Sequence, residues 1–376
     1  MFNLNKIPEE TKVLYLQTIA IAGLITSLLL SAKAWSTERR FPLSPVFSGL
    51  EVSAGLHDGL FLITILSLAG GLFRTQFRKY LIALGLVSLL TLVSLDINRL
   101  QPWVLHYFAI LFLFSSFVSK RFFTALSVLN VARIIVGGIY FWSGIQKINY
   151  RFFTEVFPWF TEHLWSPFGL AGAYTIVFIG LFVPFIESFF ALGLFTRKFR
   201  NISITGSVLM LIVVLSSIGP FGHGWNSSVW PWNIAIFSMV ILLFYGYRFS
   251  LSDFINQIRG NWLAYMMIFV FWIMPAGNLF GLTDNYLSWS LYSGKVPEAS
   301  IQGNQEFLLS ISQKAKDGEL TFVQWTLDDL NLVPYPENRV FLDVFKNLCT
   351  NNTTPLTLTI REYPDNEVIY ECNSID

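Results

Sequence analysis

The stretch from Ile139 to Phe153, IYFWSGIQKINYRFF, is almost entirely apolar or small up to Gln146 and then carries a lysine at Lys147. Extended back to residue 126, the apolar run reaches about 20 residues, the length that a helix needs to cross a lipid bilayer. A lysine at the end of such a helix has two interpretations. Its ammonium group either reaches the lipid headgroups or faces a pocket and takes part in chemistry.

The composition of the whole chain agrees with a membrane helix. Of its 376 residues, 53% are hydrophobic and only 13% are charged, whereas a soluble globular chain carries about 25% charged residues. The mean hydropathy is +0.54. We therefore predict an all-α polytopic membrane bundle. The net charge of +1 gives no indication of a nucleic-acid partner.

Apolar segments of spanning length recur along most of the chain. We predict about nine transmembrane helices, and the first of them is interpreted as a span rather than as a cleavable signal peptide. The predicted spans are 13–33, 54–73, 80–95, 103–118, 126–146, 171–195, 202–219, 229–246 and 261–275. Residues 1–12 would form a cytoplasmic N-terminus, 13–275 the helical domain, and 276–299 an aromatic, turn-rich connector.

Residues 300–376 have the composition of a small soluble α+β module. The segments FLLSISQ, LTFVQWTL, LTLTIREY and EVIYEC alternate like half-buried strands, and NRVFLDVFKNLC has helical spacing from Asn338. So short a module can form only a small core, so we expect it to lean on the helical domain or to use a disulfide. Cys349 and Cys372 lack metal-type spacing and would pair if the module is outside the cytoplasm.

The distribution of Lys and Arg between loops sets the expected orientation. With a cytoplasmic N-terminus, the inner segments hold about twelve of these residues and the outer loops about six. Nine spans then place the C-terminal module outside.

Polar residues inside apolar segments are costly, and each is a candidate functional residue. In this topology the four histidines, His57, His106, His163 and His223, all fall in the outer half. His106 taken alone is expected to be a packed, hydrogen-bonded side chain.

Two carboxylates also lie in apolar surroundings. Asp96 is expected to form a structural ion pair with Arg99, and the following QPW begins a helix with Trp103 in the aromatic belt. Glu187 lies deep in the sixth span, just after Pro184, and must be protonated or paired. A structural pairing and a proton-handling role both remain open.

Tyr140, Gly144 and Lys147 follow one another at i, i+4 and i+7, which places them on one helix face. Gly144 would allow another backbone or a ligand to come close. A lysine that faces a dry pocket gives up its proton more easily and can act as a base.

These residues resemble a known family. IYFWSGIQKINYRFF followed by HLWSPF is similar to the signature of the vitamin K-dependent gamma-carboxylase and its bacterial relatives, the HTTM family. HGWNSSVWPWNIAIF and LSWSLYSGKVPEASI are similar to later segments of that family. FIESFFALGLFTRKFRN resembles the glutamate and Gly-Leu-Thr-Arg pattern of DoxX-like proteins. The resemblance covers roughly residues 50–300.

The resemblance implies roles for individual residues. Lys147 matches the base that deprotonates vitamin K hydroquinone, and His106 matches a histidine that stabilises a carbanion, so a quinone or a vitamin K-like hydroquinone is the implied cofactor. We predict His106 or His223 as the second proton-handling group. The chain departs from the pattern at Gln146 and Asn149, which puts carboxylation of protein glutamates in doubt. The predicted substrate-binding residues are Tyr140, Gly144, Trp103, Arg99 and Asn226.

Three functions follow from this combination of features. The first is an enzyme of the bacterial inner membrane that acts on a quinol or another lipid-soluble substrate, with Lys147 as general base. The second is a non-catalytic, DoxX-like redox-associated or assembly subunit, whose C-terminal module binds a periplasmic or secreted partner. A transporter is the weakest option, because no inverted repeat is present. Membrane lipid is the expected surrounding, and no metal site is predicted.

The orientation can be tested directly. A reporter enzyme that is active only outside the cytoplasm, fused after Asp376, is expected to give signal, because the charge bias places the C-terminus outside. A reporter that is active only in the cytoplasm, fused at the same position, serves as the control. Signal from that control alone would overturn the topology.

Overall fold

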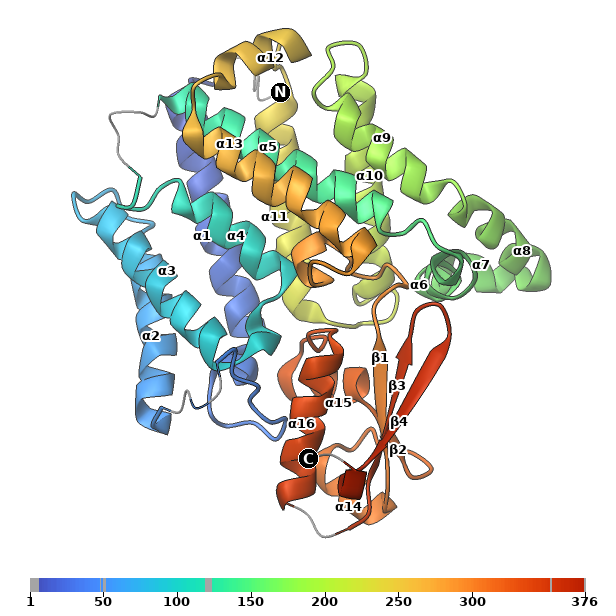
Figure 1. Ribbon diagram of the computed structural model, residues 1–376. Helices are drawn as coiled ribbons and strands as arrows, with labels where there is room; N and C mark the ends of the chain where they lie inside the picture. The colour runs from blue at the N-terminus through green and yellow to red at the C-terminus, as the bar shows by residue number, and fades with distance from the viewer. Residues whose placement is uncertain (1–6, 48, 50–51, 119–123, 352–353, 375–376) are drawn as a thin grey trace.

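The long apolar runs of the chain form helices, in which the backbone hydrogen bonds are made within one segment. The computed structural model describes residues 7–47, 49, 52–118, 124–351 and 354–374. Figure 1 shows a helical bundle with a small mixed module at the end away from the N-terminus. The helices of the bundle are α1 (Glu9–Leu30), α2 (Ala54–Gly70), α3 (Arg78–Leu95), α4 (Pro102–Phe112), α5 (Ala125–Ile145), α6 (Phe157–Phe160), α7 (Glu162–Trp165), α8 (Gly169–Gly180), α9 (Val183–Gly193), α10 (Arg200–Ile218), α11 (Trp230–Phe244), α12 (Leu251–Ile258) and α13 (Trp262–Ile268).

Among the described residues, six helical segments are long and apolar enough to cross a membrane. They are Glu9–Leu30, Arg78–Leu95, Ala125–Ile145, Arg200–Ile218, Ser227–Phe244 and Trp262–Phe280. Two predicted spans correspond to shorter apolar helices, α2 and α4. The fold is therefore mainly helical and compatible with a membrane, while the count of nine crossings stays a prediction.

The predicted span 171–195 is not one straight helix. It is divided between α8 and α9, and the segments Glu162–Gly180 and Val183–Gly193 are bent by 41° at the break between them. Pro184 lies in the first turn of α9, where its missing N–H costs nothing and its ring disturbs no preceding turn. Counted as one crossing, this bent pair raises the number of candidate spans to seven.

The C-terminal module contains a four-stranded antiparallel sheet in the order β2-β1-β3-β4. Its elements are β1 (Glu298–Gln302), α14 (Gln305–Ile311), β2 (Glu319–Thr321), α15 (Phe322–Leu330), α16 (Asn338–Asn351), β3 (Thr357–Glu362) and β4 (Asn366–Glu371). The strands predicted at LTLTIREY and EVIYEC and the helix predicted from Asn338 are confirmed.

Two predicted strands of the module are wrong. FLLSISQ lies mostly in α14, and LTFVQWTL gives two residues to β2 and the remainder to α15. Side chains cap both helices: Asn304 accepts from the N–H groups of Glu306 and Phe307, and Thr321 from that of Gln324. Phe322, Trp325, Thr326, Asp329 and Leu330 are buried at helical spacing. The side-chain caps therefore favoured helices over the weak strand-like alternation of the two segments. Strand β1 begins inside the predicted connector.

The module is held both by a disulfide and by the bundle. Cys349 and Cys372 are bonded, with their Cα atoms 5.4 Å apart. Phe41, from the loop after α1, inserts its ring between Phe322 and Trp325 of α15, at centroid distances of 6.0 and 4.7 Å. The module core thus continues into the bundle core.

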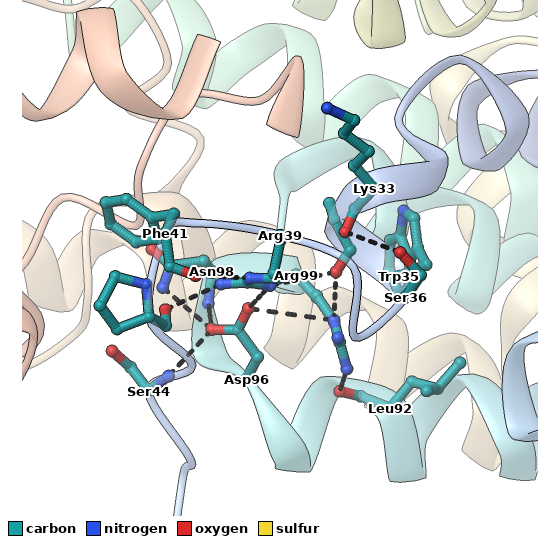
Figure 2. A network of polar contacts seen from close by, with 12 residues as sticks. Lys33, Trp35, Ser36, Arg39, Phe41, Ser44, Leu92, Asp96, Asn98 and Arg99 are labelled. Carbon is teal, nitrogen blue, oxygen red and sulfur yellow. Dashed lines mark hydrogen bonds and ion pairs between the residues drawn. The ribbon is translucent and has the colours of Figure 1, made fainter. Parts of the chain in front are cut away.

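A buried polar cluster joins the loops beneath the module, and we call Arg39, Asp96, Asn98 and Arg99 the arginine collar (Figure 2). Arg39 Nη1 donates to Asp96 Oδ2 at 2.6 Å, and the backbone and side-chain amides of Asn98 donate to Asp96 Oδ1 at 3.1 and 2.9 Å. Arg99 Nε lies 3.9 Å from Asp96 Oδ2. The expected Asp96–Arg99 pair therefore exists, but Arg39 is the closer cation.

Backbone carbonyls complete the collar. Arg99 donates to the carbonyls of Ala34 and Leu92 at 2.7 and 2.8 Å, and Arg39 donates to those of Phe41 and Pro42 at 2.7 and 2.8 Å. The loop after α1 is thereby fastened to the turn between α3 and α4. This saturation of donors is what makes a fully buried arginine pair tolerable.

The collar and its sequence neighbours Arg40, Phe41 and Gln101 form hydrogen bonds with the module. Asn98 Oδ1 accepts from the N–H of Tyr335 at 3.0 Å, and Gln101 donates to the carbonyl of Val333 at 2.9 Å. The N–H groups of Arg40 and Phe41 donate to Asp329 Oδ2 at 2.7 and 2.8 Å. The module is therefore positioned by hydrogen bonds of fixed direction as well as by apolar packing.

Asp96 carries the negative charge of the collar. Burial by itself raises the pKa of this carboxyl, but the charges of Arg39 and Arg99 outweigh burial and hold the pKa below its usual value of 3.8. A lowered folded-state pKa means that the ionised carboxylate stabilises the fold above the unfolded-state pKa. That stabilisation is lost as the pH falls through the folded-state pKa.

We expect Asp96→Asn to lower the free energy of unfolding by about 3–5 kcal/mol, because it leaves two buried guanidinium groups without a counter-charge. Unfolding of the purified protein in detergent micelles, titrated with dodecyl sulfate, measures the loss. Asp58→Asn is the matched control. Its side chain is 50% exposed, so its loss should be about 1 kcal/mol or less. Equal losses in the two variants would contradict the role given to the collar.

Candidate functional site

Lys147 lies just beyond the end of α5, and its ammonium group turns toward α9 rather than into open solvent. Nζ lies 2.6 Å from Oε2 of Glu187 and 3.0 Å from Oγ of Ser143, one helical turn earlier. The side chain of Lys147 is 15% exposed and that of Glu187 is 4% exposed. This is a largely buried ion pair between two helices.

The close approach of α5 and α9 makes this pair possible. A Cβ atom added at Gly144 would lie 2.3 Å from Oγ of Ser188 and 2.7 Å from the carbonyl oxygen of Pro184. Ser188 in turn donates to the carbonyl of Phe141 at 3.3 Å. Gly144 is therefore the contact point of two helix backbones. The expected close approach of another backbone at Gly144 is confirmed, because α9 covers that face, and its contact with substrate stays a prediction.

The ion pair lines a small cavity of about 90 Å³ formed by residues of α4, α5, α9, α10, α11 and the connector. Its lining residues are Pro102, Ile139, Tyr140, Ser143, Lys147, Glu187, Met210, Leu211, Val214, Trp232, Asn233, Ile236, Trp289, Leu291 and Tyr292. A second cavity of about 80 Å³ adjoins it and is also lined by Lys147, Glu187, Met210, Val214 and Tyr292. We call these two spaces together the Lys147 cavity.

Two hydrogen-bond donors in the lining have no partner in the described part of the chain. They are the hydroxyl of Tyr140 and the indole N–H of Trp289, and both are buried. A buried donor left unpaired costs about 1–3 kcal/mol. A ligand oxygen in the Lys147 cavity would relieve that cost, so the lining combines an ion pair, free donors and apolar walls.

Asn226 acts on the cavity through Tyr292. Its side-chain amide donates to the hydroxyl of Tyr292 at 3.0 Å, and its Oδ1 accepts from Oγ of Ser228 at 2.9 Å. Tyr292 itself has a positive φ of 56°, an uncommon conformation for a residue with a side chain. Asn226 does not line the Lys147 cavity but holds Tyr292, which does, and its predicted binding of substrate stays a prediction.

His57, His106 and His223 do not meet in one site. Nδ1 of His106 accepts from the indole N–H of Trp232 at 2.8 Å, so His106 lies behind a lining residue and not in the lining. Nε2 of His223 donates to the carbonyl of Trp159 at 2.8 Å, and Nε2 of His57 lies 2.6 Å from Nη2 of Arg99. The catalytic roles predicted for His106 and His223 therefore lack a direct contact with the Lys147 cavity.

Arg99 and Trp103, two of the predicted substrate-binding residues, are engaged elsewhere, and their role in substrate binding stays a prediction. Arg99 is fully buried, and its guanidinium is engaged in the arginine collar. Trp103 is fully buried and packs edge-to-face on Trp35 at 6.1 Å. Neither lines the Lys147 cavity. Within the described residues, no group of three or more His, Cys, Asp or Glu side chains is placed to hold a metal ion.

The sequence contained a signal for only one of the missed lining residues. Ser143 precedes Lys147 by four positions, so a helix puts the two side chains on one face. Trp232, Trp289 and Tyr292 come from a late helix and from the irregular connector, where no periodic pattern predicts direction.

Comparisons of the chain with protein-family models, with curated proteins and with solved structures find no match. The resemblance to gamma-carboxylase-like and DoxX-like proteins therefore stays a prediction.

The ion pair predicts a specific pattern of stability. Lys147→Met should destabilise the protein by about 3–5 kcal/mol, because Glu187 is then buried without a partner. Adding Glu187→Gln should recover most of that loss and give a coupling energy of about 2–3 kcal/mol, measured by unfolding in detergent. The exposed pair Arg361–Asp365 is the control, and its coupling should be about 1 kcal/mol or less. Additive effects at Lys147 and Glu187 would contradict the pairing.

Proposed function

We propose that this chain is an integral membrane protein that binds a lipid-soluble molecule with an acidic hydroxyl group beside Lys147 and Glu187, and removes its proton. The observation that carries the proposal is the buried Lys147–Glu187 pair, which shares an apolar cavity with the unpartnered hydroxyl of Tyr140. In keeping with the sequence resemblance, the molecule would be a quinol or a vitamin K-like hydroquinone.

The size of the cavity favours recognition of a head group. Sites that enclose a whole drug-sized ligand occupy about 300–1,000 Å³, whereas the two parts of the Lys147 cavity occupy about 90 and 80 Å³. A ring bearing a hydroxyl would enter between α5, α9 and α10, and its tail would remain outside. Walls such as Met210 and Val214 suit an aromatic face.

The ion pair supplies a base without adding net charge to the cavity. As the hydroxyl group binds, Lys147 passes a proton to Glu187 and becomes a neutral amine. The amine then takes the proton of the ligand hydroxyl. The final state holds a protonated Glu187, an ammonium at Lys147 and a ligand oxyanion. The oxyanion replaces the Glu187 carboxylate as the counter-ion, which avoids an unpaired charge in an apolar site.

Four neighbours would assist this transfer. The Tyr140 hydroxyl is free to donate to the oxyanion, and Ser143 holds the ammonium from the other side. Asn226 keeps Tyr292 against the same space. His106 would act indirectly, since its hydrogen bond fixes the ring of Trp232.

We expect the purified protein to deprotonate an alkylated 1-naphthol, a probe that carries the acidic hydroxyl without the redox chemistry of a quinol. The bound naphtholate absorbs at longer wavelength than the neutral naphthol. Lys147→Arg should bind the probe without producing that absorption. Arginine does not release its proton.

Lys295→Arg is the matched control, because Lys295 lies outside the lining of the Lys147 cavity, and it should retain the naphtholate signal. A full naphtholate signal from Lys147→Arg would return Lys147 to a purely structural role.

A second candidate function, a non-catalytic subunit with an extracytoplasmic protein partner, is favoured by the edge of the module. β4 is an outer strand of the sheet, and Ile369 is 63% exposed on it. An exposed apolar edge strand is a template for an extended segment of another chain. In complementation of a deletion strain, this function would be lost in Ile369→Lys and kept in Lys147→Arg, the reverse of the enzyme.

A further inference from the structure

A large basic cavity opens at the end of the bundle opposite the module. It measures about 740 Å³ and lies where α1, α3, α4 and α5 have their ends. In Figure 1 this is the end that carries the N-terminus. Its lining residues are Glu10, Val13, Gln17, Arg74, Thr75, Gln76, Arg78, Lys79, Leu113, Phe114, Ser115, Val118, Thr124, Ala125 and Val128. We propose that this cavity binds the headgroup of an anionic phospholipid.

The lining of this cavity carries an excess of positive charge. Arg74, Arg78 and Lys79 line the cavity together, and Glu10 is the single acidic residue among the described lining. No ion pair joins any of the three cations to a carboxylate in the part of the chain that the structure describes. Three like charges around one space repel one another, and an anion placed among them removes that repulsion.

The side chain of Arg78 is held in a fixed orientation. Its Nε donates to the carbonyl of Gly71 at 2.9 Å, and the same carbonyl accepts from Gln17 at 3.3 Å. Nη2 of Arg78 is buried and has no partner among the described residues. The guanidinium is thus held by one nitrogen while another donor remains open, which suits a phosphate oxygen.

The apolar walls of the cavity favour a lipid over a free phosphate. Val13, Leu113, Phe114, Val118 and Val128 form apolar walls beside the three cations. A free phosphate gains nothing from such walls, whereas the glycerol and the first acyl carbons of a phospholipid would lie against them. Basic pockets between membrane helices bind anionic headgroups for the same reason.

Other basic residues of the chain differ from this group. Arg197, Lys198 and Arg248 lie near helix ends and outside the lining of this cavity. Side chains of this kind reach the headgroup layer without forming a site. They therefore serve as the matched control, since removing them changes the net charge equally.

The experiment is native mass spectrometry of the full chain in detergent, with dioleoylphosphatidylglycerol or dioleoylphosphatidylcholine added at equal concentration. We expect phosphatidylglycerol to bind more tightly than phosphatidylcholine. Each cation removed should weaken phosphatidylglycerol binding about five-fold, so Arg74→Gln/Arg78→Gln/Lys79→Gln should lose about a hundred-fold. Arg197→Gln/Lys198→Gln/Arg248→Gln should bind phosphatidylglycerol as the wild type does.

Two further arms keep the proposal falsifiable. If the triple variant does not fold, Arg74→Gln/Lys79→Gln keeps the Arg78–Gly71 hydrogen bond and should still lose about 25-fold. Inorganic phosphate in excess should displace little phosphatidylglycerol, and full displacement would identify a free-anion site instead. Equal binding of the two lipids, or wild-type binding by the variants, would overturn the proposal.

Discussion

The buried carboxylate of Asp96 is the contact on which the arrangement of the bundle end next to the C-terminal module depends. Its two oxygens bind Arg39 and both amides of Asn98, and Arg99 lies beside it. This one negative charge holds two arginines in place. The other donors of the two arginines bind backbone carbonyls of different segments. Because those carbonyls belong to the loop after α1 and to the end of α3, neutralising one charge loosens several connections at once.

The arginine collar positions the C-terminal module. Asn98 holds the backbone of Tyr335, and Asp329 holds the loop that supplies Phe41. The connector that leads into the module also contributes Trp289, Leu291 and Tyr292 to the Lys147 cavity. The polar collar and the cavity are therefore linked through the module and the connector that leads into it.

Within the bundle, a glycine has the corresponding role. Gly144 lets α9 approach α5 until the side chains of Lys147 and Glu187 meet. A larger residue at position 144 would push α9 away and separate the two charges inside an apolar region, where an unpaired charge is costly. The small residue and the ion pair consequently depend on each other. The basic cavity at the opposite end is independent of both, because other helix ends form it.

The amino-acid sequence by itself determined the features that depend on local pattern. Apolar runs of spanning length predicted the helices, the helical spacing from Asn338 predicted α16, and the position of Glu187 in an apolar run required a partner or a proton. Where two local patterns competed, as in LTFVQWTL, the prediction of a strand was wrong because a side-chain cap at Thr321 began a helix.

Only the tertiary structure decided which distant residues meet. The partner of Glu187 lies 40 positions earlier, and the direction in which α9 leaves its bend selects Lys147. Arg39, 57 positions from Asp96, was not predicted as its partner. The predicted topology put the histidines at one membrane face. In the structure, His57 contacts Arg99, His106 accepts from Trp232, and His223 donates to the carbonyl of Trp159. Periodicity specifies the face of one helix, whereas contacts between helices are set by packing geometry and by the need to pair each buried polar group, and no single segment contains that information.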